Sequence, residues 1–287
     1  MNATSIATTR LVRGITVPAL MYGTAWKAER TAALTAAAIG CGFRAIDTAN
    51  QRKHYLEEGA GDGIKAAIGD GVVTREQVFV QTKFTPQSSQ DQRLPYDRNA
   101  GAATQVRQSI ASSLAHLGVS RLDSYILHGP SRRHGLTGTD WEIWRAMEAA
   151  IAAGEISLIG VSNVSREQLA ALTEGAKIAP AFVQNRCFAH AGWDAGVRAF
   201  CADHGIVYQG FSLLTANPSV VTSRKVAEIA GRHGRTAAQI VFRFALQAGM
   251  MPLTGTASME HMRQDLEVFD FSLSGEEHGV VLHAGMR

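Results

Sequence analysis

Short apolar runs of strand length alternate with longer amphipathic segments along nearly the whole chain. The runs lie at residues 17–22, 43–47, 78–82, 122–127, 157–161, 181–184, 206–210 and 250–253. Helical patterns lie between them, at residues 30–39, 102–117, 141–153, 168–175, 193–204, 223–233 and 237–247. This alternation is typical of parallel βαβ units rather than of hairpins. It predicts an α/β fold, a (β/α)8 TIM barrel, as a single domain over residues 1–287.

Charge, cysteine content and hydropathy limit the function classes. The formal net charge is +3, and the Lys and Arg residues are scattered, which argues against a nucleic-acid partner. Three cysteines without metal-type spacing fit a reducing compartment. Residues 1–12 lack the apolar core of a signal peptide, and no run of about 18 apolar residues occurs. We therefore expect a cytoplasmic protein without a membrane partner, as a monomer or weak homo-oligomer.

Polar residues follow successive apolar runs at the points where those strands are expected to end. Asp47 ends the second run, Lys83 follows the third, His128 follows the fourth, and Tyr55 lies just beyond Asp47. The carboxyl ends of barrel strands are where (β/α)8 enzymes place their chemistry. Taken singly, each residue has an ordinary structural explanation, as a cap, a solvated lysine or a core histidine. Metal-assisted hydrolysis needs more ligands than Asp47 and His128 provide, so we expect no metal site.

Seven short motifs accompany these strand ends in chain order. They are residues 42–50 with Tyr55, Glu57 and Glu58, then 80–84, 127–130, 160–163, 181–185, 210–214 and 253–256. Together they resemble the aldo-keto reductase family, over nearly the whole chain from residue 17 to about 273. The resemblance implies an oxidoreductase that reduces the carbonyl group of an aldehyde or ketone with NADPH, or alternatively NADH. A second function with the same fold is a nucleotide-binding regulatory module with little turnover, which acts through a protein partner.

The resemblance also implies catalytic roles. Tyr55 would be the proton donor, Lys83 would lower the pKa of its phenol, Asp47 would hold Lys83, and His128 would donate a hydrogen bond to the carbonyl oxygen. The family tyrosine commonly follows the aspartate by five residues, whereas Tyr55 follows Asp47 by eight. We assign the three extra residues, 51–53, to a longer loop, because Glu58 keeps the family spacing from Tyr55. We interpret the neighbouring charges of this loop, Arg52 to His54, as solvated.

The cofactor-binding residues are likewise implied by the resemblance. Ser162, Asn163 and Gln184 match positions that bind the nicotinamide carboxamide, and Phe211 replaces a tyrosine that stacks on the ring. The remaining positions near the ribose, the phosphates and the adenine are Gly23, Thr24, Ala25, Asp47, Ser212, Leu214, Thr256, Ser258, His261 and Asp265. No Gly-x-Gly-x-x-Gly follows the first strand, which argues against a Rossmann site.

The substrate itself is less constrained by the sequence. Gly129 replaces a tryptophan usual in the family, and the chain ends at Arg287, shortly after the expected barrel. We therefore expect an open pocket for aldehydes or ketones, shaped by Trp26 and the loop after His128.

Overall fold

The computed structural model of the protein describes residues 7–286. Eight parallel strands follow the hydrogen-bonded order β10, β3, β4, β5, β6, β7, β8, β9 of a closed barrel, which confirms the predicted fold class. They span Met21–Gly23 (β3), Ala45–Asp47 (β4), Phe79–Phe84 (β5), Leu122–Leu127 (β6), Ile156–Ser162 (β7), Phe182–Arg186 (β8), Val207–Phe211 (β9) and Met251–Thr254 (β10). Internal contacts divide the chain into two compact units, residues 22–183 and the remainder.

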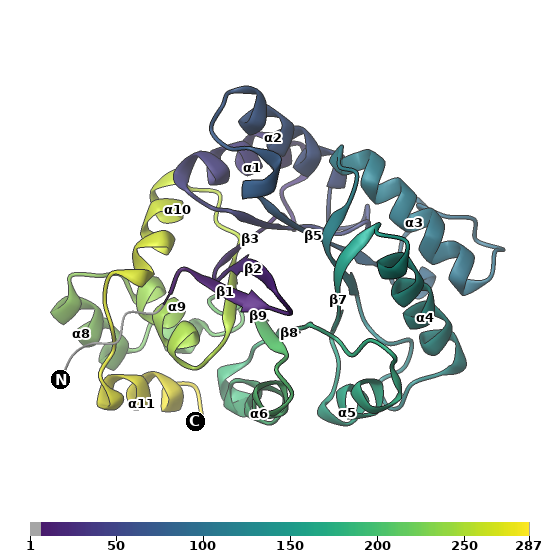
Figure 1. The fold of residues 1–287 in the computed structure, drawn as a ribbon. Helices are drawn as coiled ribbons and strands as arrows, with labels where there is room; N and C mark the ends of the chain where they lie inside the picture. The colour runs from purple at the N-terminus through teal and green to yellow at the C-terminus, as the bar shows by residue number, and fades with distance from the viewer. Residues whose placement is uncertain (1–6, 287) are drawn as a thin grey trace. The chain divides into compact units, whose positions relative to one another are not determined.

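The unit of residues 22–183 holds β3 to β7 with a helix after each strand. These helices are Thr31–Cys41 (α1), Glu57–Gly69 (α2), Ala102–Leu117 (α3), Gly138–Ala152 (α4) and Arg166–Gly175 (α5), with 3₁₀ turns at Ala28–Arg30, Arg75–Gln77 and Gln87–Ser89. Figure 1 shows α3 and α4 side by side, and α3 contacts β5 while α4 contacts β6 and β7. The strand register brings Gly23 beside Asp47, Asp47 beside Gln81 and Lys83 beside Ile126. The polar strand ends of this unit therefore lie on adjacent strands.

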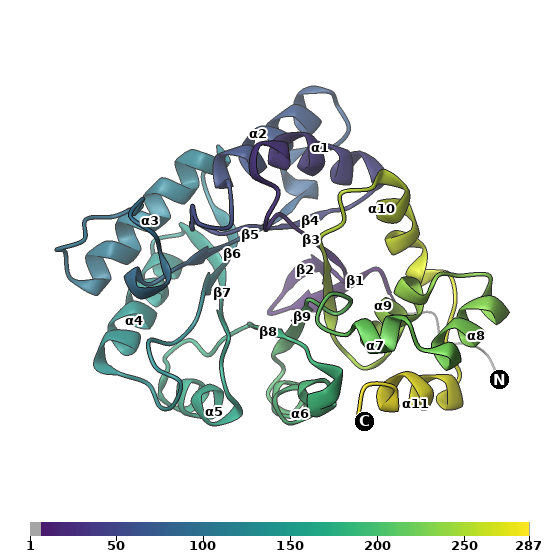
Figure 2. The ribbon, with the colours of Figure 1, turned by 180° about the vertical axis from the view of Figure 1, so that it is seen from behind.

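The second unit contains the remaining strands and helices. Its helices are Ala195–Asp203 (α6), Pro218–Val221 (α7), Arg224–His233 (α8), Ala237–Gln247 (α9), Met259–Leu266 (α10) and Gly275–His283 (α11), with 3₁₀ turns at Ala189–Asp194 and Glu267–Phe269. Figure 2 shows α7 close to α8 and α9, which it contacts. β9 and β10 pair in parallel. None of the helices in residues 7–286 combines the length and apolar character needed to cross a membrane.

The first predicted strand, residues 17–22, is wrong in its extent. Part of this run belongs to Ile15–Pro18 (β2), which pairs with Thr9–Val12 (β1) in an antiparallel hairpin, and only Met21–Gly23 joins the barrel. Arg13 and Gly14 link the two hairpin strands, and both have positive φ angles, 48° and 83°. Two successive left-handed residues are what a tight two-residue hairpin turn requires. The alternation of strands and helices did not predict this hairpin.

Candidate active site

Asp47 and Lys83 form a buried ion pair between neighbouring strands β4 and β5. Lys83 Nζ donates to Asp47 Oδ1, to Asp47 Oδ2 and to the Thr48 carbonyl, each at 2.7 Å. The side chain of Lys83 has no exposed surface, and that of Asp47 is 4% exposed. Burial lowers the pKa of Lys83, while the Asp47 carboxylate opposes that shift. The ammonium has only three hydrogens, so these three acceptors use all of them.

A polar layer beneath the ion pair was not predicted. Gln81 Nε2 donates to Asp47 Oδ1 at 2.7 Å, and Ser124 Oγ donates to Gln81 Oε1 at 2.9 Å. All three side chains are buried. Gln81 and Lys83 are two residues apart on β5, and side chains two apart on a strand share a face. That spacing was the available signal, because a glutamine on the face of Lys83 meets the same carboxylate.

Tyr55 lies at the end of the lengthened loop, with its ring beside Lys83 and His128. Lys83 Nζ is 5.3 Å from the centroid of the Tyr55 ring, and the centroids of Tyr55 and His128 are 6.1 Å apart. Burial, and secondly the charge of Asp47, raise the pKa of Tyr55 above its ordinary value of 10. The expected lowering by Lys83 is therefore not found. The main reason is the burial of the phenol, and Lys83, whose hydrogens are all directed to Asp47 and Thr48, donates no hydrogen bond to it.

His128 follows β6 and is held from two sides. Its Nδ1 lies 2.7 Å from the hydroxyl of Thr85, a buried residue just after β5. Its carbonyl oxygen accepts a hydrogen bond from Asn163 Nδ2 at 2.8 Å. Burial, and then the charge of Lys83, lower the pKa of His128 to about 3. The imidazole is therefore neutral at physiological pH and carries a single N–H.

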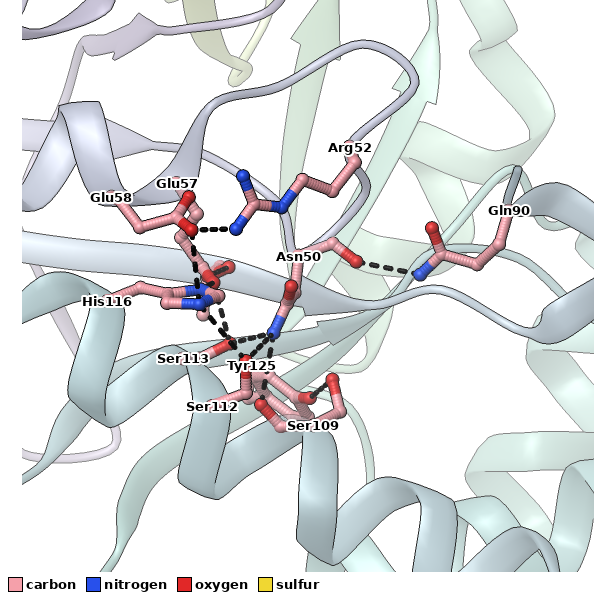
Figure 3. Close-up of polar contacts among 11 residues, drawn as sticks. Asn50, Arg52, Glu57, Glu58, Gln90, Ser109, Ser112, Ser113, His116 and Tyr125 are labelled. Carbon is pink, nitrogen blue, oxygen red and sulfur yellow. Dashed lines mark hydrogen bonds and ion pairs between the residues drawn. The ribbon is translucent and has the colours of Figure 1, made fainter. Parts of the chain in front are cut away.

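The loop between β4 and α2 is anchored on helix α3 by a polar network, shown in Figure 3. The Asn50 amide donates to the Ser109 carbonyl and to the hydroxyls of Ser112 and Ser113, at 3.1–3.3 Å. Ser112 and Ser113 lie three and four residues after Ser109, so both lie on the side of α3 that carries Ser109. Gln90 Nε2 donates to the Asn50 carbonyl at 2.8 Å. The loop therefore folds back onto α3 rather than projecting away.

The second half of this network surrounds two adjacent carboxylates at the start of α2. His116 Nδ1 lies 2.8 Å from Glu57 Oε2, and His116 Nε2 lies 3.3 Å from Glu58 Oε1 (Figure 3). Glu57, which is 2% exposed, also accepts from Ser113 and from the Thr82 hydroxyl. Glu58 pairs with Arg52. The interpretation of Arg52 as a merely solvated charge is therefore wrong, because it closes the loop onto α2.

Trp26 and His54 form an exposed aromatic pair. Their ring centroids are 4.0 Å apart, and the Trp26 amide donates to the His54 carbonyl at 2.8 Å. Trp26 is 72% exposed and has a φ angle of 62°. Its backbone hydrogen bond to His54 therefore ties the turn after β3 to the residue before Tyr55. His54 is not simply solvated either.

Several predicted cofactor residues lie in the unit of residues 22–183. Thr24 donates to the Asp47 carbonyl through its amide at 2.9 Å and its hydroxyl at 3.1 Å. The flanking Gly23 and Ala25 are half-buried. Asn163 has a positive φ angle of 53° and donates to Ser162 Oγ at 3.1 Å as well as to His128. The Asn163 side-chain amide is therefore held in place by the two hydrogen bonds that it donates.

Other predicted cofactor residues belong to the second unit. Gln184 Nε2 donates to Gln209 Oε1 at 3.0 Å. The Phe211 ring is partly exposed, and the Arg186 guanidinium lies 5.6 Å from its centroid. Ser212 begins a turn in which its carbonyl accepts from the Ala216 amide at 2.9 Å, and the Leu214 carbonyl accepts from Asn217. Phe211 is the last residue of β9, and Ser212 and Leu214 lie in the turn that follows it.

The start of α10 presents a set of small polar groups. Ser258 caps the helix by accepting from the His261 amide at 3.3 Å, and Thr256 Oγ1 lies 3.5 Å from His261 Nδ1. Asp265, in contrast, is buried and accepts from the Thr254 hydroxyl at 2.6 Å. Burial raises the pKa of Asp265 to about 6. Thr256, Ser258 and His261 are therefore the accessible members of this set.

Comparison with known proteins identifies the class. The chain matches the aldo/keto reductase family model over residues 19–282 and therefore belongs to that family. It is 30% identical to morphine 6-dehydrogenase of Pseudomonas putida, covering 93% of this chain and 87% of that protein. Aldo-keto reductase family 1 member A1 of Xenopus tropicalis is 27% identical over 96% of this chain and 88% of its own. Members of this family are oxidoreductases that act on small-molecule carbonyl compounds.

The solved structures agree with this assignment. The Bombyx mori aldo-keto reductase in complex with NADP has a TM-score of 0.84 and 25% identity, covering 98% of this chain and 93% of that chain. An aldo/keto reductase from Brucella melitensis has a TM-score of 0.82 at the same identity, with 96% and 98% covered. The family uses nicotinamide cofactors, in agreement with the predicted NAD(P)H.

Proposed function

We propose that this chain reduces an aldehyde or ketone to an alcohol with NADPH, and that Tyr55 is the proton donor. The observation that carries the proposal is the cluster of a buried lysine–aspartate pair and a neutral histidine around one tyrosine ring. Each of these residues is supplied by the end of a strand or the loop that follows it. The family membership supports the reaction type, and the local chemistry supports the assignment of roles.

The raised pKa of Tyr55 suits a general acid. A phenol that stays protonated at neutral pH holds the proton that a new alkoxide needs, and an alkoxide is a far stronger base than a phenolate. The neutral His128 would donate its one N–H to the carbonyl oxygen and orient it. Lys83 would stabilise the phenolate that remains after proton transfer, through its nearby positive charge rather than a hydrogen bond. When bound, the reduced nicotinamide supplies the hydride that the carbonyl carbon accepts.

The residues assigned to the cofactor fit its chemistry. A carboxamide needs both donors and acceptors, which the Ser162 hydroxyl and the fixed Asn163 amide provide. Thr256, Ser258 and the first amides of α10 suit a phosphate, with His261 beside them. The exposed Arg263, on the same helix, adds positive charge and favours the 2′-phosphate of NADPH over NADH.

The substrate we propose is a carbonyl compound with an aromatic or other flat apolar group. The exposed Trp26 ring, which packs against His54, the residue before Tyr55, offers a flat apolar surface. Gly129 leaves room after His128, since a methyl group there would meet its nearest neighbours only at 3.5 Å. Both features favour a wide entrance over one fitted to a short aldehyde.

The test is a steady-state assay of the purified protein with NADPH or NADH and a panel of aromatic and aliphatic aldehydes and ketones. The disappearance of reduced nicotinamide would be followed by absorbance, and alcohol formation by chromatography. We expect turnover with NADPH, with higher kcat/KM for aromatic carbonyls. Cofactor binding, measured by fluorescence quenching, without alcohol formation for any member of the panel would contradict the proposal.

A further inference from the structure

Thr85 stands out because its buried hydroxyl contacts one polar side-chain atom only. Among residues 7–286, the sole polar partner of Thr85 Oγ1 is His128 Nδ1, at 2.7 Å. The residue follows β5 directly, two positions after Lys83, and no part of it is exposed. Neither the motifs nor the assigned catalytic roles account for this contact.

The backbone of Thr85 is fixed independently of His128. Its carbonyl accepts from the Tyr96 hydroxyl at 2.7 Å and from Gln90 Nε2 at 3.4 Å. The amide of His128 in turn donates to the Phe84 carbonyl at 2.9 Å. The hydroxyl and the imidazole are therefore held facing each other by the main chain on both sides.

The number of hydrogens available decides whether Thr85 Oγ1 or His128 Nδ1 is the donor. A threonine hydroxyl has one hydrogen, and a buried hydrogen without an acceptor is unfavourable. If Nδ1 carried the imidazole proton, it would donate to Oγ1, and the hydroxyl hydrogen would have no acceptor among the described side chains. If Nδ1 is bare, the hydroxyl donates to it, and every polar group in the contact is satisfied.

We propose that Thr85 sets the tautomer of His128, so that the ring carries its single proton on Nε2. Nε2 is then the atom that donates to the carbonyl oxygen of the substrate, which rests on the function proposed above. Thr85 is in this view a positioning residue that acts through His128. The depressed pKa of His128 supports the inference, since a neutral ring has one proton to place.

The test uses two variants that differ in one hydroxyl. Thr85→Val keeps the branched shape and loses the hydroxyl, whereas Thr85→Ser keeps the hydroxyl. The protein has ten histidines, so nitrogen-15 NMR signals of His128 are assigned by their disappearance in His128→Asn. We expect a protonated Nε2 and a bare Nδ1 in the wild type and in Thr85→Ser, and a mixture of tautomers in Thr85→Val. Thermal unfolding and circular dichroism check that both variants fold.

The kinetic test compares the change in kcat with the change in the KM for NADPH. For Thr85→Val we expect kcat to fall roughly tenfold to a hundredfold, in the range seen when the hydrogen-bond partner behind a functional histidine is removed. The KM for NADPH should stay within about twofold, because the cofactor-binding residues are untouched. Thr85→Ser should keep most of the wild-type kcat.

Three results would overturn the proposal. One is a wild-type His128 with its proton on Nδ1. Another is a Thr85→Val protein that keeps both the Nε2 proton and the wild-type kcat. The third is an equal loss of kcat in both variants with unchanged nitrogen signals, which would mean that Thr85 only packs. If the wild type reduces no carbonyl compound, the proposed function fails, but the nitrogen signals still decide the tautomer.

Discussion

Lys83 interacts with Tyr55 only through its charge. Its three hydrogens are directed to the Asp47 carboxylate and the Thr48 carbonyl, so none is left to donate to the phenol. The aspartate therefore fixes the lysine and at the same time compensates its charge. A positive charge held in this way stabilises a neighbouring group most when that group becomes negative, as Tyr55 does when it loses its proton.

Breaking this ion pair from one side should be costly. Lys83→Met leaves the Asp47 carboxylate buried without its cation, which typically destabilises a protein by about 3–5 kcal/mol. Adding Asp47→Asn removes the stranded charge, and we expect the double variant to regain roughly half of that loss or more. Urea unfolding of the wild type, both single variants and the double variant gives the coupling. Additive effects of the two substitutions would contradict the account of the pair.

Asp265 gives the stability a defined pH dependence. Its pKa is about 6 in the folded protein and 3.8 for an ordinary aspartate, so between these values the native state holds a proton that the unfolded chain releases. Its favourable contribution is therefore complete below about pH 4 and is lost as the pH rises through 6. Asp265→Asn should stabilise the protein at pH 7.5 by roughly 1–3 kcal/mol and have little effect near pH 4.

Urea unfolding at several pH values measures this difference. The exposed Asp270 is the matched control, and Asp270→Asn should leave the unfolding free energy nearly unchanged at every pH. A stabilisation by Asp265→Asn that does not vary with pH would argue against a proton bound to this carboxyl.

At the scale of elements, helix α2 approaches α3 so closely that only glycine fits. A Cβ on Gly61 would lie 2.1 Å from the His116 carbonyl oxygen and 2.8 Å from Leu117 Cα, and backbone atoms cannot move aside easily. Gly61→Ala should therefore destabilise the protein by about 1–3 kcal/mol, the usual range for overpacking. Gly69, in the same helix, has nothing within 4 Å, and Gly69→Ala should be neutral or stabilising. Equal effects of both, measured by thermal unfolding, would count against this close approach.

The same contact between α2 and α3 holds the loop that carries Tyr55. His116→Ala removes the contacts to Glu57 and Glu58 and leaves a buried carboxylate with fewer donors, for a loss of about 1–3 kcal/mol. We expect kcat to fall, while the KM for NADPH stays within about twofold. The exposed His204 is the control, since His204→Ala leaves this loop untouched. A His116→Ala protein with wild-type kcat would show that the loop needs no such anchor.

The sequence predicted elements better than it predicted contacts between them. The helix 102–117 and the strand 122–127 agree with the structure residue for residue, because strong periodicity and a glycine at position 118 define their ends. The residues expected at strand ends, Asp47, Lys83 and His128, do lie there. The roles of Gln81, Thr85 and His116 were not predicted, since each of these side chains contacts a residue that lies far from it in the sequence. The raised pKa of Tyr55 was also missed, because it depends on burial and on how Lys83 shares its hydrogens.

At the scale of the whole molecule, the assigned roles are divided along the chain. The four residues assigned to proton transfer and orientation lie between positions 47 and 128, whereas those assigned to the phosphates and adenine lie between 212 and 265. Apart from Asp47, which is also assigned to the cofactor, substitutions in the first stretch should therefore change the chemical step with little effect on cofactor affinity. Substitutions in the second should do the reverse. This division allows chemistry and binding to be measured separately in one protein.

The most direct measurement is single-turnover reduction by wild type and Tyr55→Phe, with NADPH bound in advance and its affinity measured separately by fluorescence quenching. The phenylalanine keeps the ring beside Lys83 and removes only the proton donor. We predict an unchanged NADPH affinity and a rate of alcohol formation lower by about 10²–10⁴, the usual contribution of a general acid. A Tyr55→Phe protein that forms alcohol at the wild-type rate would contradict the assignment of Tyr55.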